Sequence, residues 1–328
     1  MIAPAARAAL REALGDAVRF GVPLRRFTSL RVGGPADAVV TPADRGELSR
    51  ALVACAAHAI PHCVLGGGFN TIAREGGVDG VVLVMRKLRG LALRDDGTIR
   101  AEAGVSHNTL TKLCIANGRS GLEFGAGIPG TIGGWVAMNA GIGEREVKDA
   151  IVALEVMRPD GTLVETIERD RLDFRYRGLH GLAKGAVVVA AIFATTASTP
   201  EAVRAEVDRL LARRHATQPL DAPSCGSVFK NPPGDFAGRL VEEVGLKGAT
   251  AGGAQISTVH ANFIVNRGDA SADDVLALVE RARRSVREAF GVELETEVEI
   301  LGRADAPRGA RGASGAGAHD ERGAGGTR

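Results

Sequence analysis

Hydrophobic and polar positions alternate along this chain in a way that predicts short strands interspersed with amphipathic helices. Five short apolar runs bounded by turn residues are typical of strands: Val81–Met85, Ile99–Ala103, Ile151–Met157, Thr162–Thr166 and Ala186–Thr195. The turns Asp95-Asp-Gly97 and Pro159-Asp-Gly161 predict hairpins between neighbouring runs. We also expect a strand and turn at Thr28–Asp37 and a strand at Cys63–Leu65, which leads into a glycine loop.

Helical spacing predicts helices over residues 1–20, from Thr41-Pro42, at Glu201–His215, near Phe236–Val244 and at Ser271–Phe290. Thr41 is expected to cap the second helix, whose apolar face comprises Leu48, Leu52, Val53 and Ala56. Ser271 and Asp274 form a capping-box start for the last, with Val275, Leu278, Val279, Ala282 and Val286 on one face.

The C-terminal part of the chain changes character twice. Val292–Leu301 alternates apolar residues with glutamates, which predicts a half-buried strand with an acidic face. Residues 304–328 are mostly glycine, alanine and arginine, and too few apolar side chains are present to offset the entropy of ordering. We therefore expect a disordered tail.

Composition narrows the class of protein. A length of 328 residues with 45% hydrophobic residues predicts two soluble domains, and 41 basic against 39 acidic residues argue against a nucleic-acid partner. The four cysteines show no C-x-x-C spacing, and we find neither a signal peptide nor a membrane-spanning segment in the sequence. We therefore expect a cytoplasmic protein with no membrane association. His58, His62 and Cys63 are close in sequence, but no fourth ligand is near, so we expect no metal.

Two glycine-rich segments, Gly66–Asn70 and Gly125–Gly141, carry candidate binding chemistry. Consecutive backbone N–H groups can cradle a diphosphate without a cationic side chain, so the pair predicts two loops closing on one extended cofactor. The first loop alone would equally suit a tight turn after a strand. The second contains G-x-G-x-x-G, but Pro129 and the glycines that follow disfavour the helix that a Rossmann motif requires.

A third segment, Gly226–Pro232, places a hydroxyl (Ser227), an ammonium (Lys230) and a carboxamide (Asn231) close together and suggests a separate reactive site. Taken alone, Ser227 also suits a structural turn, Arg177 a surface cation and Glu297 a solvated sheet face. Cys225 has no identifiable histidine partner, which favours a small packed thiol over a nucleophile.

Together these segments resemble the UDP-N-acetylenolpyruvoylglucosamine reductase family from about residue 20 to residue 302. The segments that carry the resemblance are Thr28–Asp37, Leu65–Asn70, Gly125–Gly141, Phe174–Arg177, Pro223–Gly234, His260–Asn266 and Leu294–Val298. The implied fold class is α+β, with an FAD-binding domain of the vanillyl-alcohol-oxidase type in two subdomains. The domains would be residues 1–200 for the flavin and 201–303 for the substrate, as in the family's shorter subtype, followed by the tail at 304–328.

The resemblance implies an enzyme of peptidoglycan precursor synthesis, in which NADPH reduces noncovalent FAD and the flavin then reduces an enolpyruvyl nucleotide sugar. Arg177 and Glu297 would stabilise the enolate-like intermediate, Ser227 would deliver the proton, and Lys230 and Asn231 would bind the substrate. The residues implied for the flavin are Gly66, Gly67, Gly68, Phe69, Asn70, Gly125, Gly127, Ile128, Pro129, Gly130, Thr131, Gly133, Gly134, Asn139, Ala140 and Gly141. We expect a monomer.

Several positions depart from the family pattern. Phe69 replaces a serine of the glycine loop, Trp135 a small residue and Cys225 an alanine, while Gly178-Leu-His180 replaces small polar residues after Arg177. Two alternatives therefore stay open: an FAD-dependent oxidase or dehydrogenase of the same superfamily acting on an alcohol or hydroxy acid, and a nucleotide-sugar binder without catalysis.

Overall fold

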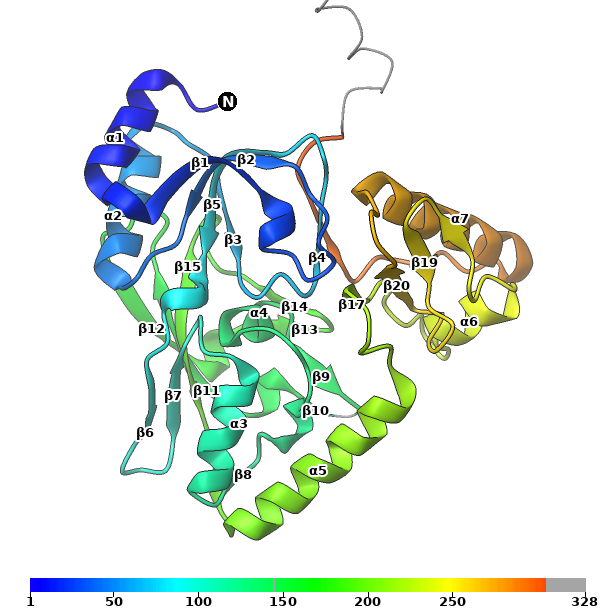
Figure 1. Cartoon of the computed structure of the whole chain (residues 1–328). Coiled ribbons are helices and arrows are strands. Elements are labelled where there is room, and N and C mark those ends of the chain that lie inside the picture. Colours follow the sequence, from blue (N-terminus) through cyan, green and yellow to red (C-terminus); the bar gives the residue numbers. More distant parts are fainter. Residues whose placement is uncertain (144, 305–328) are drawn as a thin grey trace, which may run out of the picture.

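The computed structural model describes residues 1–143 and 145–304, which form three sheets with helices packed against them (Figure 1). Apart from Ala304, the tail predicted at 304–328 lies outside the described residues. In the part of the chain that is described, no helix combines the length and the apolar character needed to cross a membrane.

The first sheet has the order β1-β2-β5-β3, formed by β1 (Val18–Pro23), β2 (Pro35–Val40), β5 (Val78–Val84) and β3 (His62–Leu65). The pair β1–β2 is antiparallel, whereas the pairs β2–β5 and β5–β3 are parallel. The helices α1 (Pro4–Leu14) and α2 (Arg45–Ala57) pack against each other and bury Leu10, Leu48 and Leu52 in one core with Val81 and Leu83 of β5. The glycine loop leaves this sheet directly after β3.

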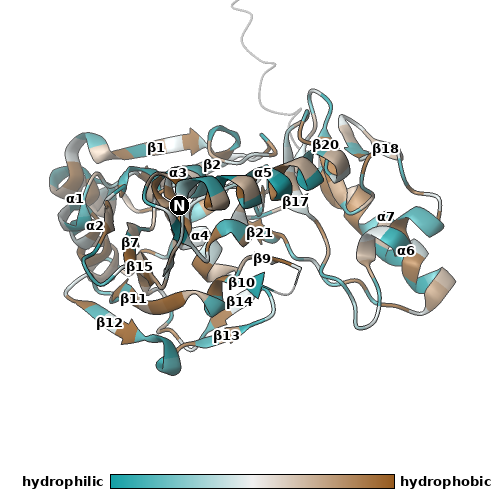
Figure 2. Cartoon of the chain, turned by 90° about the horizontal axis from the view of Figure 1, so that it is seen from below, coloured by the Kyte–Doolittle hydropathy of each residue, from teal (hydrophilic) through white to brown (hydrophobic). Residues whose placement is uncertain are grey.

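The second sheet is antiparallel in the order β12-β11-β15-β7-β6. Its strands are β12 (Val164–Glu168), β11 (Ile151–Met157), β15 (Val187–Phe193), β7 (Ile99–Glu102) and β6 (Leu91–Leu93). The second predicted hairpin is confirmed, but across the first turn β7 pairs with β6, which was not predicted, because the run Val81–Met85 lies in the first sheet. The strands β11 and β15 are largely hydrophobic (Figure 2). The helix α4 (Ile132–Ala137) packs on β15, while α3 (His107–Ala116) packs against the long helix α5 (Pro200–Thr217).

The third sheet lies in a separate C-terminal unit, in the order β17-β20-β19-β18. Its strands are β17 (Ser224–Ser227), β20 (Phe263–Asn266), β19 (Ala254–Ile256) and β18 (Thr250–Ala251). The helix α6 (Ala237–Glu243) connects β17 to β18, and α7 (Ala272–Phe290) follows β20 and packs on β18 and β19. The predicted capping box at Ser271 is present, and the predicted apolar face of α7 is buried. Cys225 is buried in this core, and burial raises the pKa of its thiol to about 12, as a packed thiol requires.

The chain then returns to the first unit, where β21 (Glu299–Leu301) pairs in parallel with β4 (Thr71–Ala73), directly after the glycine loop. Three two-stranded pairs complete the fold: β8 (Arg119–Ser120) with β16 (Thr196–Ala197), β9 (Gly141–Ile142) with β10 (Arg145–Glu146), and β13 (Asp173–Arg175) with β14 (Gly178–His180).

Some predicted boundaries near the N-terminus are wrong. The first helix ends at Leu14, because Gly15 adopts a positive φ of 51° and the chain turns into β1. Thr41 does not cap α2; the carboxylate of Asp44 accepts the N–H of Glu47 instead, so the helix starts later. Leu48 and Leu52 are buried as predicted, but Val53 and Ala56 face solvent. The strand expected from Thr28 begins only at Pro35, after an irregular turn.

The strand predicted over Val292–Leu301 is also mostly absent, since only Glu299–Leu301 form one. Leu294 and Val298 are buried as the alternation predicts, but Ile300 is exposed. The segment crosses from the third sheet to β4, so its main chain follows hydrogen bonds to both units rather than one regular ladder.

A charge network joins α2 to the second sheet. Arg100 donates to Glu155 through Nε at 2.7 Å and Nη2 at 3.0 Å, and Arg45 of α2 pairs with the same carboxylate. The side chain of Glu155 is only 12% exposed. These guanidinium groups hold its pKa at about 2, well below its ordinary value.

We predict that Glu155→Gln lowers the free energy of unfolding at pH 7 by about 2 kcal/mol, because a charge-assisted, partly buried pair is lost. The stabilisation from Glu155 is fully present above pH 4.5 and disappears as the pH falls toward 2, so the two proteins should converge in stability over that range. Urea denaturation at several pH values measures this difference. Glu165→Gln, which removes an exposed pair with Arg158, should change stability by less than about 1 kcal/mol and serves as the control.

Candidate active site

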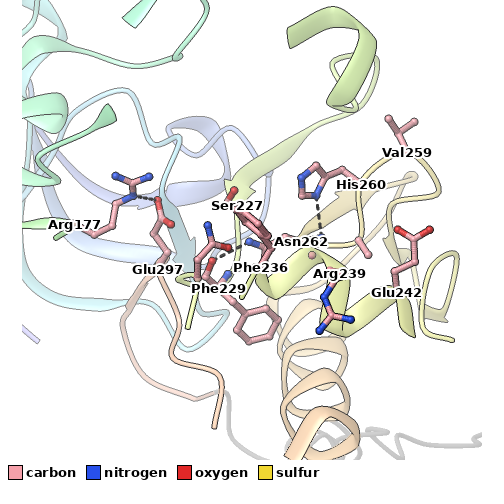
Figure 3. Close-up of a pocket in the computed structure, with 13 residues that line it drawn as sticks. Arg177, Ser227, Phe229, Phe236, Arg239, Glu242, Val259, His260, Asn262 and Glu297 are labelled. Carbon is pink, nitrogen blue, oxygen red and sulfur yellow. Dashed lines mark hydrogen bonds and ion pairs between the residues drawn. The ribbon is translucent and has the colours of Figure 1, made fainter. Parts of the chain in front are cut away.

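Two cavities carry the predicted site residues, one beside the third sheet and one at the glycine loops. The first, of about 420 Å³, is lined by Arg177, Ser227, Asn231, Asn262 and Glu297 together with residues of α6 and the turn before β20 (Figure 3). The second, of about 560 Å³, is lined by both glycine-rich segments. The three predicted catalytic residues, separated by up to 120 positions, thus share the first cavity.

Arg177 lies in the two-residue turn between β13 and β14, in the left-handed region with φ of 57°. Its Nε donates to Oε1 of Glu297 at 3.0 Å, and its Nη1 lies 3.6 Å from Oε1 of Glu146. Its side chain is 19% exposed. The left-handed conformation is unfavourable for arginine. The carboxylates of Glu146 and Glu297, which flank the guanidinium group, hold Arg177 in it.

Glu297 turns inward, contrary to the solvated sheet face that its alternating sequence suggests. Its main chain is held from both units, since its N–H donates to the Val228 carbonyl at 2.8 Å and its carbonyl accepts from Nδ2 of Asn70 at 3.0 Å. Burial raises the pKa of its carboxyl group, and the charge of Arg177 only partly opposes that shift. Glu297 is therefore easier to protonate than an exposed glutamate.

Glu146 is a site residue that the sequence analysis missed. Besides its contact with Arg177, its carboxylate pairs with Lys148 at 2.7 Å and accepts from Nδ2 of the buried Asn139 at 2.8 Å. Asn139 was predicted to bind the flavin, but its side chain is fully engaged in this bracing. The support of Arg177 therefore comes from Glu146 and Asn139, and not from the altered residues that follow it, Gly178-Leu-His180.

Ser227 ends β17, directly after Gly226, which adopts a positive φ of 77°. The hydroxyl of Ser227 has no hydrogen-bond partner among the described residues, and it faces the first cavity. A hydroxyl without an internal partner beside a buried Arg–Glu pair is available to exchange a proton with a bound molecule.

Asn262, also missed by the sequence analysis, holds the main chain of Phe229, two residues after Ser227. Its side chain is buried, and it accepts from the N–H of Phe229 at 2.9 Å and donates to the carbonyl of the same residue at 2.8 Å. Nearby, Nδ1 of His260 accepts from the N–H of Asn262 at 3.2 Å, so in the neutral ring Nε2 carries the proton. The only sequence signal for either residue was the segment His260–Asn266.

The two predicted substrate-binding residues are placed differently. Asn231 lines the first cavity, although its Oδ1 accepts from the N–H of Ala237 at the start of α6. Lys230 does not line the cavity. Its Nζ instead donates to the carboxylate of Glu295 at 3.2 Å.

The second cavity brings together the glycine loops, which are some sixty residues apart in sequence. A Cβ at Gly67 would lie 2.9 Å from Cα of Gly130, and one at Gly66 would lie 2.5 Å from Oγ1 of Thr131. Gly68, at φ of 73°, lies against the carbonyl of Phe27. Only glycine fits these close approaches, which confirms that the two segments converge and removes the isolated-turn interpretation of the first loop.

The groups around this cavity fit a diphosphate. Oγ1 of Thr131 is buried without a hydrogen-bond partner, and Arg26, Arg86 and Arg89 supply positive charge that the sequence analysis did not identify. Phe69 lies over the loop junction with its ring against Gly67, and it is 40% exposed. Bare backbone, an unsatisfied hydroxyl and three arginines together match an anionic ligand with many acceptors.

Trp135, another departure from the family pattern, packs inside the second unit. It stacks on His107 with ring centroids 4.1 Å apart, and its Cη2 would lie 1.7 Å from a Cβ at Gly125. The large ring thus occupies the space beside Gly125, and it does not line the second cavity.

Comparisons with known proteins agree with this geometry. A family model described as an FAD binding domain matches residues 36–167, and one described as the C-terminal domain of UDP-N-acetylenolpyruvoylglucosamine reductase matches residues 218–301. Reductases of that name from Geobacter metallireducens and Anaeromyxobacter sp. are 43% and 46% identical to the chain, covering 90% and 89% of it and 97% and 88% of their own lengths. A crystal structure of the Thermus caldophilus reductase aligns with a TM-score of 0.76 and 37% identity, covering 87% of this chain and 99% of that one.

We predict that Asn262→Ala lowers the free energy of unfolding by about 2 to 4 kcal/mol, because both main-chain groups of Phe229 lose a buried partner. Urea denaturation measures the change. In Asn117→Ala, an exposed side chain loses a single bond to the Leu113 carbonyl, and a cost below about 1 kcal/mol is expected. Equal costs for the two variants would contradict the bracing role.

Proposed function

Because the chain belongs to the UDP-N-acetylenolpyruvoylglucosamine reductase family, we propose that it uses NADPH and FAD to reduce UDP-N-acetylglucosamine enolpyruvate to UDP-N-acetylmuramate. It is an FAD-dependent oxidoreductase of peptidoglycan precursor synthesis. The predicted α+β fold class, with an FAD-binding region and a C-terminal α+β domain, is confirmed. The observation that carries the proposal is the Arg177–Glu297 pair beside the free hydroxyl of Ser227.

We propose that residues 1–200 hold the flavin and residues 201–303 the substrate. The first helix of the second range, α5, packs on α3, so it also supports the flavin unit. We propose that the protein acts as a monomer, in which residues of a single chain line both cavities. The cytoplasm, which contains NADPH and nucleotide sugars, is the proposed location, and four free cysteines agree with it.

The second cavity would hold the FAD diphosphate on the N–H groups of the two glycine loops. The residues proposed for the cofactor are those of the first loop, Gly66, Gly67, Gly68, Phe69 and Asn70, and those of the second, Gly125, Gly127, Ile128, Pro129, Gly130, Thr131, Gly133, Gly134, Ala140 and Gly141. Asn139 would act indirectly through Glu146. When bound, FAD accepts a hydride from NADPH and passes it to the methylene carbon of the enolpyruvyl group.

Hydride addition leaves negative charge on the carbon beside the substrate carboxylate and on the carboxylate itself. The guanidinium group of Arg177 would stabilise that charge, and Glu297, whose pKa is raised by burial, can donate a hydrogen bond in its protonated form. Oγ of Ser227 would then give its proton to the carbon and regain one from solvent. Asn231 in the cavity wall and Lys230 beside it would bind the polar groups of the nucleotide sugar.

We predict that Ser227→Ala leaves reduction of the flavin by NADPH within about twofold, while reoxidation by the enolpyruvyl substrate slows by about 10²- to 10⁴-fold, since only the second step needs the proton. Anaerobic stopped-flow absorbance of the flavin band measures both steps. Ser224→Ala, in the same strand, is the matched control and should retain both rates. Equal loss of the two steps in Ser227→Ala would refute the proton-donor role, and bleaching of the wild type by an alcohol or hydroxy acid would favour an oxidase or dehydrogenase.

We also predict that Gly67→Ala weakens FAD binding at least about tenfold, because the new methyl group fills the cradle between the two loops. Titration of the apoprotein with FAD, followed by quenching of flavin fluorescence, measures the affinity. Gly268→Ala, where a Cβ meets nothing within 4 Å, should bind FAD like the wild type. If Gly67→Ala bound FAD with unchanged affinity, the proposed position of the diphosphate between the two glycine loops would be wrong.

A further inference from the structure

The turn Thr28–Arg31 belongs to the segments that carry the family resemblance, yet the proposed mechanism assigns it no role. Oγ1 of the buried Thr28 donates to the carbonyl of Val32 at 2.9 Å and closes the turn. Arg31 adopts a positive φ of 61°, which is unfavourable for arginine. Strain of this kind persists where surrounding contacts hold the backbone, and it is concentrated at functional sites. The contacts of this turn therefore indicate what it does.

Ser29, inside this turn, contacts both the first glycine loop and the C-terminal unit. Its N–H donates to the carbonyl of Gly68 at 2.9 Å. Its Oγ lies 2.9 Å from the same carbonyl and 2.6 Å from the carbonyl of Ser224, at the start of β17. A hydroxyl has a single hydrogen, and the Gly68 carbonyl already accepts the main-chain N–H, so the hydroxyl donates to Ser224. Ser29 thus joins the first glycine loop to the strand that carries Ser227.

The strand β17 is incompletely held by its own sheet. It is the edge strand of the third sheet, and its pairing with β20 is irregular between Ser224 and Ser227. The N–H of Asn266 in β20 donates to the Pro223 carbonyl at 2.8 Å. Successive carbonyls of an antiparallel strand point to opposite sides, so the carbonyl of Ser224 points away from β20. The hydroxyl of Ser29 therefore supplies a bond that the sheet does not.

Leu30 docks the same turn on the C-terminal unit. Its side chain is fully buried in one hydrophobic cluster with Val228 and Ile264. Its carbonyl accepts from Nδ2 of the buried Asn266 at 3.0 Å. Ser29 also lines the second cavity, whereas Ser227 lines the first. The turn thus connects the walls of the two cavities.

We propose that Ser29 is a positioning residue, whose bond to Ser224 fixes the distance between Ser227 and the cofactor at the glycine loop. The inference rests on the proposed function, and it assigns Ser29 no bond to the reacting atoms. Ser224 lies three residues before Ser227, so a bond at Ser224 restricts the movement of the proton donor. Proton transfer needs the donor within hydrogen-bond reach, and a displacement of about 1 Å can slow a reaction by about 10²-fold.

The test is Ser29→Ala, which removes only the hydroxyl. We expect FAD affinity and flavin reduction by NADPH to stay within about threefold of the wild type, because neither needs the proton donor. The limiting rate of flavin reoxidation by the enolpyruvyl sugar should fall about 10- to 100-fold, while the half-saturating sugar concentration stays within about threefold. Amide hydrogen exchange over residues 224–229, followed by mass spectrometry, should become at least about fivefold faster, because β17 loses its outer bond.

Ser49→Ala is the matched control. The Oγ of Ser49 also donates to a carbonyl at 2.6 Å, that of Gly161, but Ser49 lines neither cavity. Amide exchange in β17 and the rates of both flavin steps should therefore match the wild type in this variant.

Either unchanged amide exchange in β17 or an unchanged limiting rate of reoxidation in Ser29→Ala would overturn the proposal. Equal slowing of both flavin steps would assign Ser29 a general structural role and would also overturn it. If the wild type did not react with the enolpyruvyl sugar, the proposed function would fail. Amide exchange in β17 would still decide the role of Ser29, since it needs no turnover: faster exchange in Ser29→Ala supports positioning, and unchanged exchange overturns it.

Discussion

The site depends on the return of the chain from the C-terminal unit to the glycine loop. Pairing of β21 with β4 brings the segment that contains Glu297 beside Asn70, whose side chain holds the Glu297 carbonyl. The N–H of the same residue is bound to Val228, next to Ser227. Glu297 is thus hydrogen-bonded both to the first glycine loop and to the residue after Ser227, so the two units cannot separate without breaking these bonds.

Polar and charged side chains inside this protein are of two kinds: pairs that satisfy each other, and buried groups without a hydrogen-bond partner. The pair of Arg100 with Glu155 is internally satisfied, bidentate and remote from both cavities, as a structural contact should be. In contrast, Oγ1 of Thr131, beside Gly66, and Nε of Arg214, beside Gly127, are buried without a hydrogen-bond partner. A buried polar group without a partner is unfavourable, so the free Oγ1 of Thr131 in the wall of the second cavity suits a hydrogen bond to a bound molecule.

The departures from the family pattern are accommodated locally. Trp135 packs against Gly125 and stacks on His107, and Phe69, which is 40% exposed, lies against Gly67 at the loop junction. Arg177 keeps its position because Glu146 and Glu297 flank it, whatever residues follow in the hairpin. None of these changes removes a group from the proposed chemistry.

The sequence alone determined what local rules control: the two hairpin turns, the capped helix α7, the glycine loops and the motifs that carry the family resemblance. It could not turn Glu297 inward or identify Asn262, since their partners Arg177 and Phe229 lie 120 and 33 positions away along the chain. It also missed Glu146, whose contact with Arg177 spans two hairpins, and it placed the cap of α2 at Thr41 although Asp44 was equally suitable. The tertiary structure decided those roles. A side chain's chemistry depends on which groups surround it and how much water they exclude, and neither is encoded within a few residues of its position.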